Sequence, residues 1–121
     1  MRHLMSPLDF SVEELDELLK LAQDIEAHPD KYAHACDGKK LATLFYEPST
    51  RTRSSFELAG KYLGADVINL SPSGSSMGKG ESFRDTLLTM SYMGTDAIVM
   101  RHSAEGAPLY ATKAVDPIII N

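Results

Sequence analysis

Hydrophobic positions near the start of the chain recur every three or four residues, which predicts an amphipathic helix. Ser11, with Glu14 three residues later, has the capping-box pattern typical of a helix N-terminus. The apolar residues that follow share one helical face: Val12, Leu15, Leu18, Leu19, Ala22 and Ile25. Pro29 is expected to end this helix, and residues 28–40 are expected to form a polar connection.

Farther along, short apolar runs alternate with helical patterns. We expect strands at residues 41–46, 65–70, 97–100 and 117–120, and helices at residues 50–63, 81–93 and 106–114. Gly64 and Gly94 are natural helix stops. This alternation is typical of βαβ units, in which helices cover both faces of a parallel sheet. The predicted fold class is therefore α/β, a three-layer α/β/α domain with a four-stranded parallel sheet.

Composition and charge narrow the class of protein. The chain has 121 residues, 43% of them hydrophobic, as expected for one folded domain. A net charge of -5 argues against a nucleic-acid partner. No apolar run approaches the about 20 residues of a membrane span, and there is no signal-peptide pattern. Because Cys36 is the single cysteine, we expect no internal disulfide and a cytoplasmic setting.

The strongest candidate for chemistry is Ser49-Thr50-Arg51-Thr52-Arg53, between a predicted strand and a predicted helix. Ligands of open parallel sheets bind beyond the carboxyl ends of the strands. Backbone N–H groups at a helix N-terminus favour anions, and hydroxyl and guanidinium groups add further donors. The motif is therefore suited to hold a dianion and contains no proton-abstracting base. The alternative is an N-capping cluster with solvated arginines.

Two further segments follow predicted strands. Residues 71–80 form a polar Gly/Ser loop with Lys79, whose spacing does not fit a nucleotide P-loop. Arg101 and His102 come directly after the third strand, at the expected binding edge. A plain surface loop and a salt-bridged surface arginine remain open as alternatives. The histidines at positions 3, 28 and 34 have no ligand-like spacing, so we expect no metal site.

These motifs resemble a known family. The segment 45–57 resembles the carbamoyl-phosphate signature of the aspartate/ornithine carbamoyltransferases. The segment 79–82, and Met100-Arg101-His102 followed by residues 105–107, resemble the aspartate branch of that family. The ornithine branch is similar at the first motif and usually differs at the other two. The resemblance extends from about residue 7 to the end of the chain.

The resemblance implies roles for individual residues. The implied carbamoyl-phosphate ligands are Ser49, Thr50, Arg51, Thr52, Ser76, Lys79 and Arg101. Thr52 and Arg101 are the candidates for stabilising the oxyanion. Lys79, with Ser76 or alternatively Ser75, would reach into a neighbouring subunit's active site. Glu47 would join an inter-domain ion pair.

The implied reaction is carbamoyl transfer from carbamoyl phosphate to L-aspartate, giving N-carbamoyl-L-aspartate and phosphate in pyrimidine biosynthesis. The implied assembly is a homotrimer with shared active sites, and a regulatory chain is a further implied partner; no cofactor is implied. Residues 1–121 would be an incomplete carbamoyl-phosphate-binding domain, truncated after the fourth strand and lacking the aspartate-binding domain. We therefore expect little or no activity from this chain alone. Alternatives are an ornithine carbamoyltransferase and a non-catalytic phosphate-binding or assembly fragment.

Overall fold

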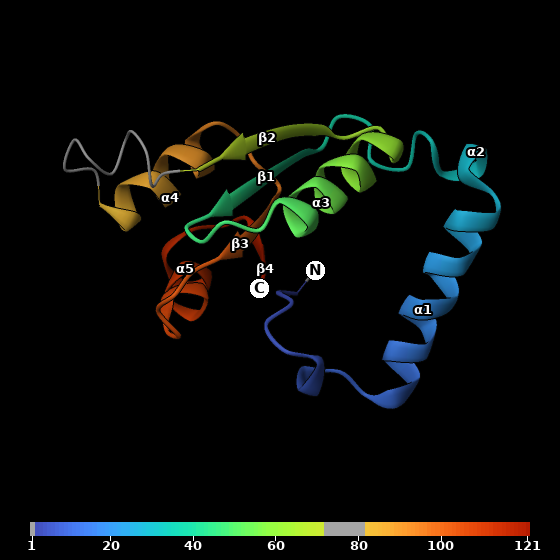
Figure 1. The fold of residues 1–121 in the computed structure, drawn as a ribbon, viewed down its shortest axis with the longest axis horizontal. Helices are drawn as coiled ribbons and strands as arrows, with labels where there is room; N and C mark the ends of the chain where they lie inside the picture. Colours follow the sequence, from blue (N-terminus) through green and yellow to red (C-terminus); the bar gives the residue numbers. More distant parts are fainter. Residues whose placement is uncertain (1, 72–81) are drawn as a thin grey trace.

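A parallel four-stranded sheet forms the centre of the computed structural model, which describes residues 2–71 and 82–121 (Figure 1). The strands are β1 (Lys40–Phe45), β2 (Asp66–Leu70), β3 (Ala97–Arg101) and β4 (Ile118–Ile120). Their order across the sheet is β2-β1-β3-β4, and every neighbouring pair is parallel. All four expected strands are present within one or two residues of their predicted bounds, so the predicted α/β class is confirmed.

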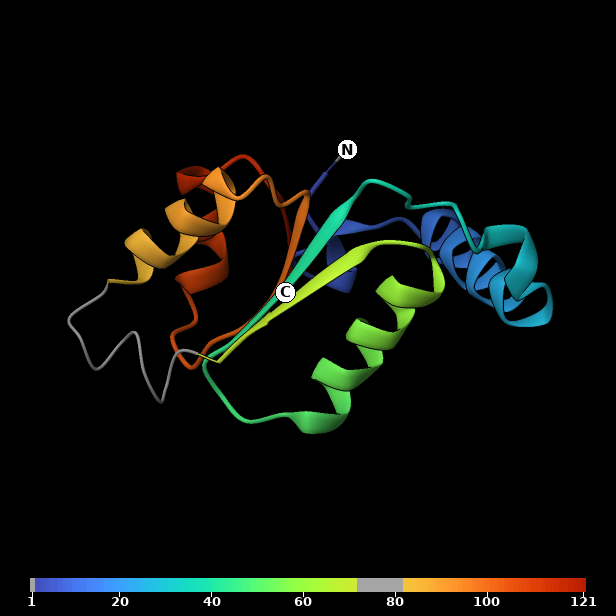
Figure 2. The ribbon, with the colours of Figure 1, turned by 90° about the horizontal axis from the view of Figure 1, so that it is seen from above.

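Helices lie on both faces of this sheet. The helices of the described residues are α1 (Val12–Ala27), α2 (Pro29–Tyr32), α3 (Thr50–Tyr62), α4 (Phe83–Tyr92) and α5 (Ala107–Ala114), preceded by a 3-10 turn, η1 (Pro7–Asp9), and of these α3, α4 and α5 lie on the sheet. Figure 2 shows α3 on one face of the sheet and α4 with α5 on the other. The predicted three-layer arrangement is therefore confirmed. In the part of the chain that is described, no helix is both long and apolar enough to cross a membrane.

The core lies between the sheet and the α4–α5 layer. Its fully buried members include Leu44, Leu87, Met90, Ile98 and Ile119. The edge strand β2 is much less buried than the inner strands β1 and β3. The most buried apolar runs thus correspond to β1 and β3, the two strands that have a neighbouring strand on each side.

Glycines shape the passage from helix to strand. Gly64 after α3 and Gly94 after α4 have φ angles of 90° and 81°, a left-handed conformation that side chains rarely adopt. Gly60 has a different role, because a Cβ atom there would lie 2.9 Å from Val67 Cγ2 and 3.0 Å from Leu41 Cδ2. The lack of a side chain at Gly60 therefore allows α3 to approach β1 and β2 closely.

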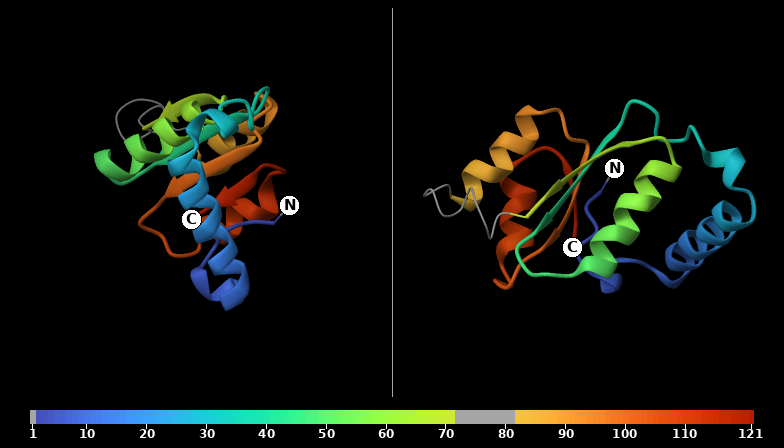
Figure 3. Two further views of the ribbon diagram at one scale, coloured as in Figure 1. Left: turned by 90° about the vertical axis from the view of Figure 1, so that its right-hand side faces the viewer. Right: turned by 45° about the horizontal axis from the view of Figure 1, so that its top comes forward.

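The N-terminal segment differs from expectation in two ways. The Ser11 capping box is present, but Pro29 begins the short helix α2 instead of only ending α1. Proline suits the first helical position, where its missing N–H costs nothing. In addition, α1 has no buried residue, and it stands beside the sheet instead of covering it (Figures 1 and 3). Its apolar face is thus largely exposed, with Leu19 63% accessible.

A crevice lies at the carboxyl end of the sheet, next to the point where the strand order changes direction. From β1 the chain passes through α3 to β2 on one side, while β3 lies on the other side of β1 with its helices on the opposite face. Loops that follow β1 and β3 therefore diverge at this point, where open parallel sheets bind ligands. Phe45, which ends β1, is in register with Arg101, which ends β3.

Candidate functional site

The N-terminus of α3 opens directly onto this crevice. Ser49 is the N-cap residue, yet its side chain makes no capping hydrogen bond. The first backbone bond of the helix runs from the Arg53 N–H to the Ser49 carbonyl at 2.9 Å. The N–H groups of Thr50, Arg51 and Thr52 therefore have no intrahelical partner. Together with the helix dipole, they form a positive end that favours an anion.

The Ser49 hydroxyl has a different partner, Arg101. Arg101 Nη1 donates to Ser49 Oγ at 3.0 Å, and Arg101 Nε donates to Glu47 Oε2 at 3.2 Å. The backbone is tied as well, because the Tyr46 N–H donates to the Arg101 carbonyl at 2.9 Å. The two expected motifs after β1 and β3 are thus joined by hydrogen bonds into one cluster.

A cavity of about 400 Å³ lies beside this cluster, at the carboxyl ends of β1 and β2. It is lined by Phe45, Glu47, Pro48, Ser49, Thr50, Arg53, Asn69, Leu70 and Ser71. The structure therefore brings Glu47, Ser49 and Thr50 to one wall, next to Arg53 and Asn69.

The remaining expected site residues are placed differently. Arg51 is exposed, Thr52 is half-buried, and neither lines the cavity. Arg51 makes no hydrogen bond or ion pair with another side chain in the described segments. Its guanidinium group is thus not engaged by any of those residues. The expected loop residues Ser75, Ser76 and Lys79 lie outside the described residues.

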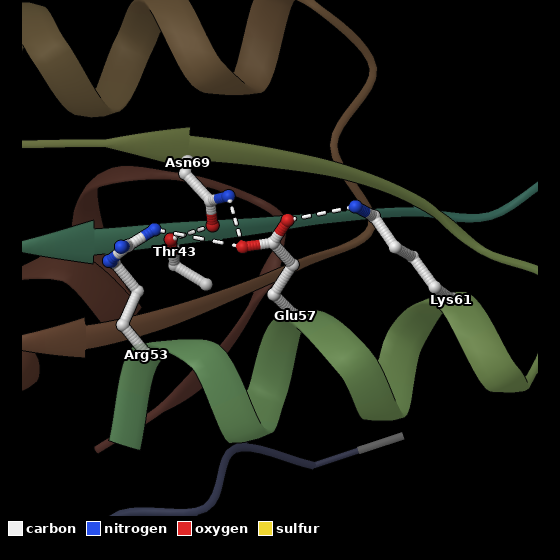
Figure 4. A network of polar contacts seen from close by, with 5 residues as sticks. All are labelled: Thr43, Arg53, Glu57, Lys61 and Asn69. Atoms are coloured by element: carbon white, nitrogen blue, oxygen red, sulfur yellow. Dashed lines mark hydrogen bonds and ion pairs between the residues drawn. The ribbon is translucent and has the colours of Figure 1, made fainter. Parts of the chain in front are cut away.

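A polar network fastens the cavity wall to the sheet (Figure 4). Thr43 Oγ1 donates to Asn69 Oδ1 at 2.6 Å, and Asn69 Nδ2 donates to Glu57 Oε1 at 2.8 Å. Lys61 Nζ donates to Glu57 Oε2 at 2.8 Å, while Arg53 Nη1 lies 3.7 Å from Glu57 Oε1. The hydrogen bonds from Lys61 and then Asn69 hold the pKa of Glu57 below its ordinary value. Sequence reasoning missed this network, although the spacing of four residues between its helical members was a usable signal.

His102 belongs to an aromatic cluster behind the site. Its ring centroid lies 4.5 Å from that of Tyr46 and 5.1 Å from that of Phe83, and Tyr110 packs on Phe83 at 5.9 Å. His102 Nδ1 accepts the Ala104 N–H at 2.9 Å. These contacts give His102 a packing role, with one ring nitrogen already used. Sequence reasoning did not find the cluster, because its members come from four separate segments.

The donors of this site determine its chemistry. Hydroxyl, guanidinium and backbone N–H groups gather around the crevice, and Glu47, a carboxylate in the cavity wall, is paired with Arg101. Such a set can bind a dianion and stabilise negative charge that develops on an oxygen atom. Among the described residues, no three His, Cys, Asp or Glu side chains are grouped to hold a metal ion.

Comparisons with known proteins agree with this geometry. The aspartate/ornithine carbamoyltransferase, carbamoyl-P binding domain family matches residues 2–121. The aspartate carbamoyltransferase catalytic subunit of Clostridium botulinum is 54% identical over an alignment of 121 positions, which covers 99% of this chain and 39% of that protein. The corresponding subunit of Clostridium perfringens is 53% identical, with the same coverage of both chains.

Solved structures give the same result. The catalytic subunit of M. jannaschii aspartate transcarbamoylase has a TM-score of 0.89 and 44% identity, over 100% of this chain and 40% of that one. Trypanosoma cruzi aspartate transcarbamoylase in complex with carbamoyl phosphate has a TM-score of 0.91 and 32% identity, over 99% of this chain and 39% of that one. The chain thus spans about two fifths of the length of these relatives, and it belongs to the carbamoyl-P binding domain family of the aspartate/ornithine carbamoyltransferases.

Proposed function

We propose that residues 1–121 form an incomplete carbamoyl-phosphate-binding domain of an aspartate carbamoyltransferase, which transfers a carbamoyl group from carbamoyl phosphate to L-aspartate. The observation that carries this proposal is the hydrogen bond from Arg101 Nη1 to Ser49 Oγ at 3.0 Å. It joins the end of β3 to the N-terminus of α3, so that a guanidinium group and unpaired N–H groups face one crevice. The names of the relatives, which are aspartate carbamoyltransferases, support the choice of reaction.

In this proposal the phosphate group sits at the N-terminus of α3. The N–H groups of Thr50, Arg51 and Thr52 and the hydroxyl of Ser49 bind its oxygens, and the guanidinium of Arg51 turns in to complete a bidentate contact. Arg101 bridges the phosphate and the carbonyl oxygen of the carbamoyl group.

The proposed reaction needs electrostatic stabilisation more than a protein base. The amine of L-aspartate attacks the carbonyl carbon, and a tetrahedral oxyanion forms opposite Thr52 and Arg101. The bond from carbon to the bridging oxygen then breaks, and the leaving phosphate accepts the amine proton. Holding both substrates in register supplies much of the remaining rate.

Other parts of the proposal depend on residues or copies beyond those described. Lys79, with Ser76 or Ser75, would act in the active site of a neighbouring copy within a homotrimer, and a regulatory chain and a cytoplasmic setting remain part of the proposal. Glu47, which is paired with Arg101 here, would instead form an ion pair with a residue of another domain. Because the chain spans 39% of its relatives' length, we expect the L-aspartate side of the site to be supplied elsewhere, and little or no transferase activity from these 121 residues alone.

The test is a calorimetric titration of the 121-residue chain with carbamoyl phosphate. We expect saturable binding that Arg51→Ala weakens by about 1.5–3 kcal/mol, because a charge-assisted contact is lost. Arg2→Ala is the matched control, since Arg2 pairs with Glu14 far from the crevice. Absence of binding by the unaltered chain, or equal binding by Arg51→Ala, would refute the phosphate assignment.

A further inference from the structure

Arg53 is the second arginine of the motif after β1, and the proposed function leaves it without a role. It lies in the first turn of α3, its side chain is 33% exposed, and it lines the cavity. Figure 4 shows the Arg53 side chain rising from α3 toward the sheet, with one guanidinium nitrogen facing Glu57 and the others turned toward the arrowheads of the strands. Its position therefore places N–H donors at the carboxyl ends of β1 and β2.

The attachment of Arg53 to Glu57 is loose. Arg53 Nη1 lies 3.7 Å from Glu57 Oε1, which is beyond hydrogen-bond distance. Both oxygens of Glu57 already accept closer donors, from Lys61 Nζ at 2.8 Å and from Asn69 Nδ2 at 2.8 Å. The carboxylate is thus satisfied without Arg53, and the guanidinium donors are not used by it.

The position of Glu57 is fixed from beneath. Thr43 is fully buried, and its hydroxyl donates to Asn69 Oδ1 at 2.6 Å. This bond orients the Asn69 amide so that its Nδ2 donates to Glu57. Arg53 consequently stands beside a carboxylate that is held by two other donors and lies 3.7 Å from its guanidinium group.

The charges of the cavity lining favour an anion next to Arg53. Among the described lining residues the charged ones are Glu47 and Arg53, and Glu47 is engaged by Arg101 Nε at 3.2 Å. Of these two charges, that of Arg53 has the more distant partner. A dianion that approaches to ordinary hydrogen-bond distance would interact with it more strongly than Glu57 does at 3.7 Å.

We propose that Arg53 is a further binding residue for the phosphate group, contacting it from the β2 side of the cavity while Arg101 contacts it from the β3 side. This inference rests on the proposed function, because it takes the same anion into the same crevice. The planar fork of the guanidinium group suits two phosphate oxygens at once.

The experiment titrates inorganic phosphate into the chain, followed by calorimetry and by ³¹P line broadening, with thermal unfolding as the measure of folding. We expect Arg53→Gln to weaken phosphate binding about tenfold, the low end for a lost charged contact at a partly exposed site. Arg53→Lys, which keeps the charge but not the fork, should weaken binding by a smaller factor. Arg53→Lys also tests the role of Arg53 if Arg53→Gln does not fold.

The matched control is Lys61→Gln. It removes the same charge from the same helix and from the same partner, Glu57, but Lys61 does not line the cavity. Equal weakening in Lys61→Gln and Arg53→Gln, or unchanged binding in both Arg53 variants, would overturn this inference. If Arg51→Ala abolishes binding while the Arg53 variants retain it, the proposed function stands and only the role of Arg53 fails. No phosphate binding by the unaltered chain would overturn both.

Discussion

Arg101 and Ser49 are 52 residues apart in the sequence, yet a hydrogen bond of 3.0 Å joins Arg101 Nη1 to Ser49 Oγ. The bond has a local effect on the helix that Ser49 precedes. A serine at the N-cap position usually accepts a backbone N–H of the first turn, but here its side chain makes no such bond. The Ser49 hydroxyl thus accepts from Arg101 instead of from the first N–H groups of α3.

Replacement of Arg101 should weaken ligand binding with little effect on the stability of the fold. We expect Arg101→Ala to weaken carbamoyl phosphate binding about tenfold or more, because a charged donor at the crevice is lost. The free energy of unfolding should change by less than about 1 kcal/mol, since the ion pair with Glu47 is half-exposed. Calorimetric titration and urea unfolding measure the two effects, with Arg84→Ala as control. A large loss of stability with unchanged affinity would show that Arg101 is structural.

Gly60 should resist even the smallest side chain. Gly60→Ala would bring a Cβ atom to 2.9 Å from Val67 Cγ2, so either the side chains of Val67 and Leu41 or α3 itself has to shift. We expect a loss of about 1–3 kcal/mol in the free energy of unfolding. Gly106→Ala is the matched control, because a Cβ there meets nothing within 4 Å. Equal urea midpoints for the two variants would contradict the close approach seen at Gly60.

Acidification should reveal the Glu57 network. The pKa of Glu57 is lowered from 4.5, chiefly by the Lys61 hydrogen bond, so the ionised carboxylate stabilises the folded chain. That contribution is present above the ordinary pKa and is lost as the pH falls through the lowered value. Glu57→Gln should therefore differ most from the unaltered chain near neutral pH, and the difference should shrink on acidification.

Urea unfolding at a series of pH values measures this difference. Glu14 and Asp24 also have lowered pKa values, but they are present in both chains and cancel from the comparison. A difference between Glu57→Gln and the unaltered chain that stays constant with pH would mean that the network does not depend on the charge of Glu57.

Two leucines that both lie in predicted apolar helix faces should differ in how much they stabilise the fold, because they differ in burial. Leu87 is fully buried between α4 and the sheet, whereas Leu19 on α1 is 63% exposed. We expect Leu87→Ala to cost about 2–5 kcal/mol of unfolding free energy, and Leu19→Ala to stay within about 0.5 kcal/mol. Comparable losses in chemical denaturation would mean that α1 packs on the rest of the chain more closely than the structure shows.

The pattern of apolar residues was sufficient for the central elements. The strands β1, β3 and β4 contain short apolar runs, which are visible without any knowledge of the fold. The short helix α2 was missed for a physical reason. Its four residues are too few to show a period, and Pro29 can begin a helix as well as end one.

Periodicity also predicts a helix without identifying its partner. The apolar face of α1 was predicted correctly, yet the helix buries none of its residues in this chain. For the site, the rule on strand ends indicated the segments that contain Ser49 and Arg101. Their direct contact depends on β3 lying next to β1, and the order of strands is set by tertiary packing that no local pattern reveals.

The hydrogen bond between Arg101 and Ser49 also links binding to folding. Ser49 follows β1 and Arg101 ends β3, so the two residues meet only when β1 pairs with β3. This pairing joins distant parts of the chain, and closing the loop between them costs conformational entropy. The crevice is therefore absent from any partly folded chain in which this pairing has not formed. A dianion that binds both residues, as proposed, would hold β1 and β3 together, and above its Kd it would stabilise the native chain by an amount that rises with the logarithm of its concentration.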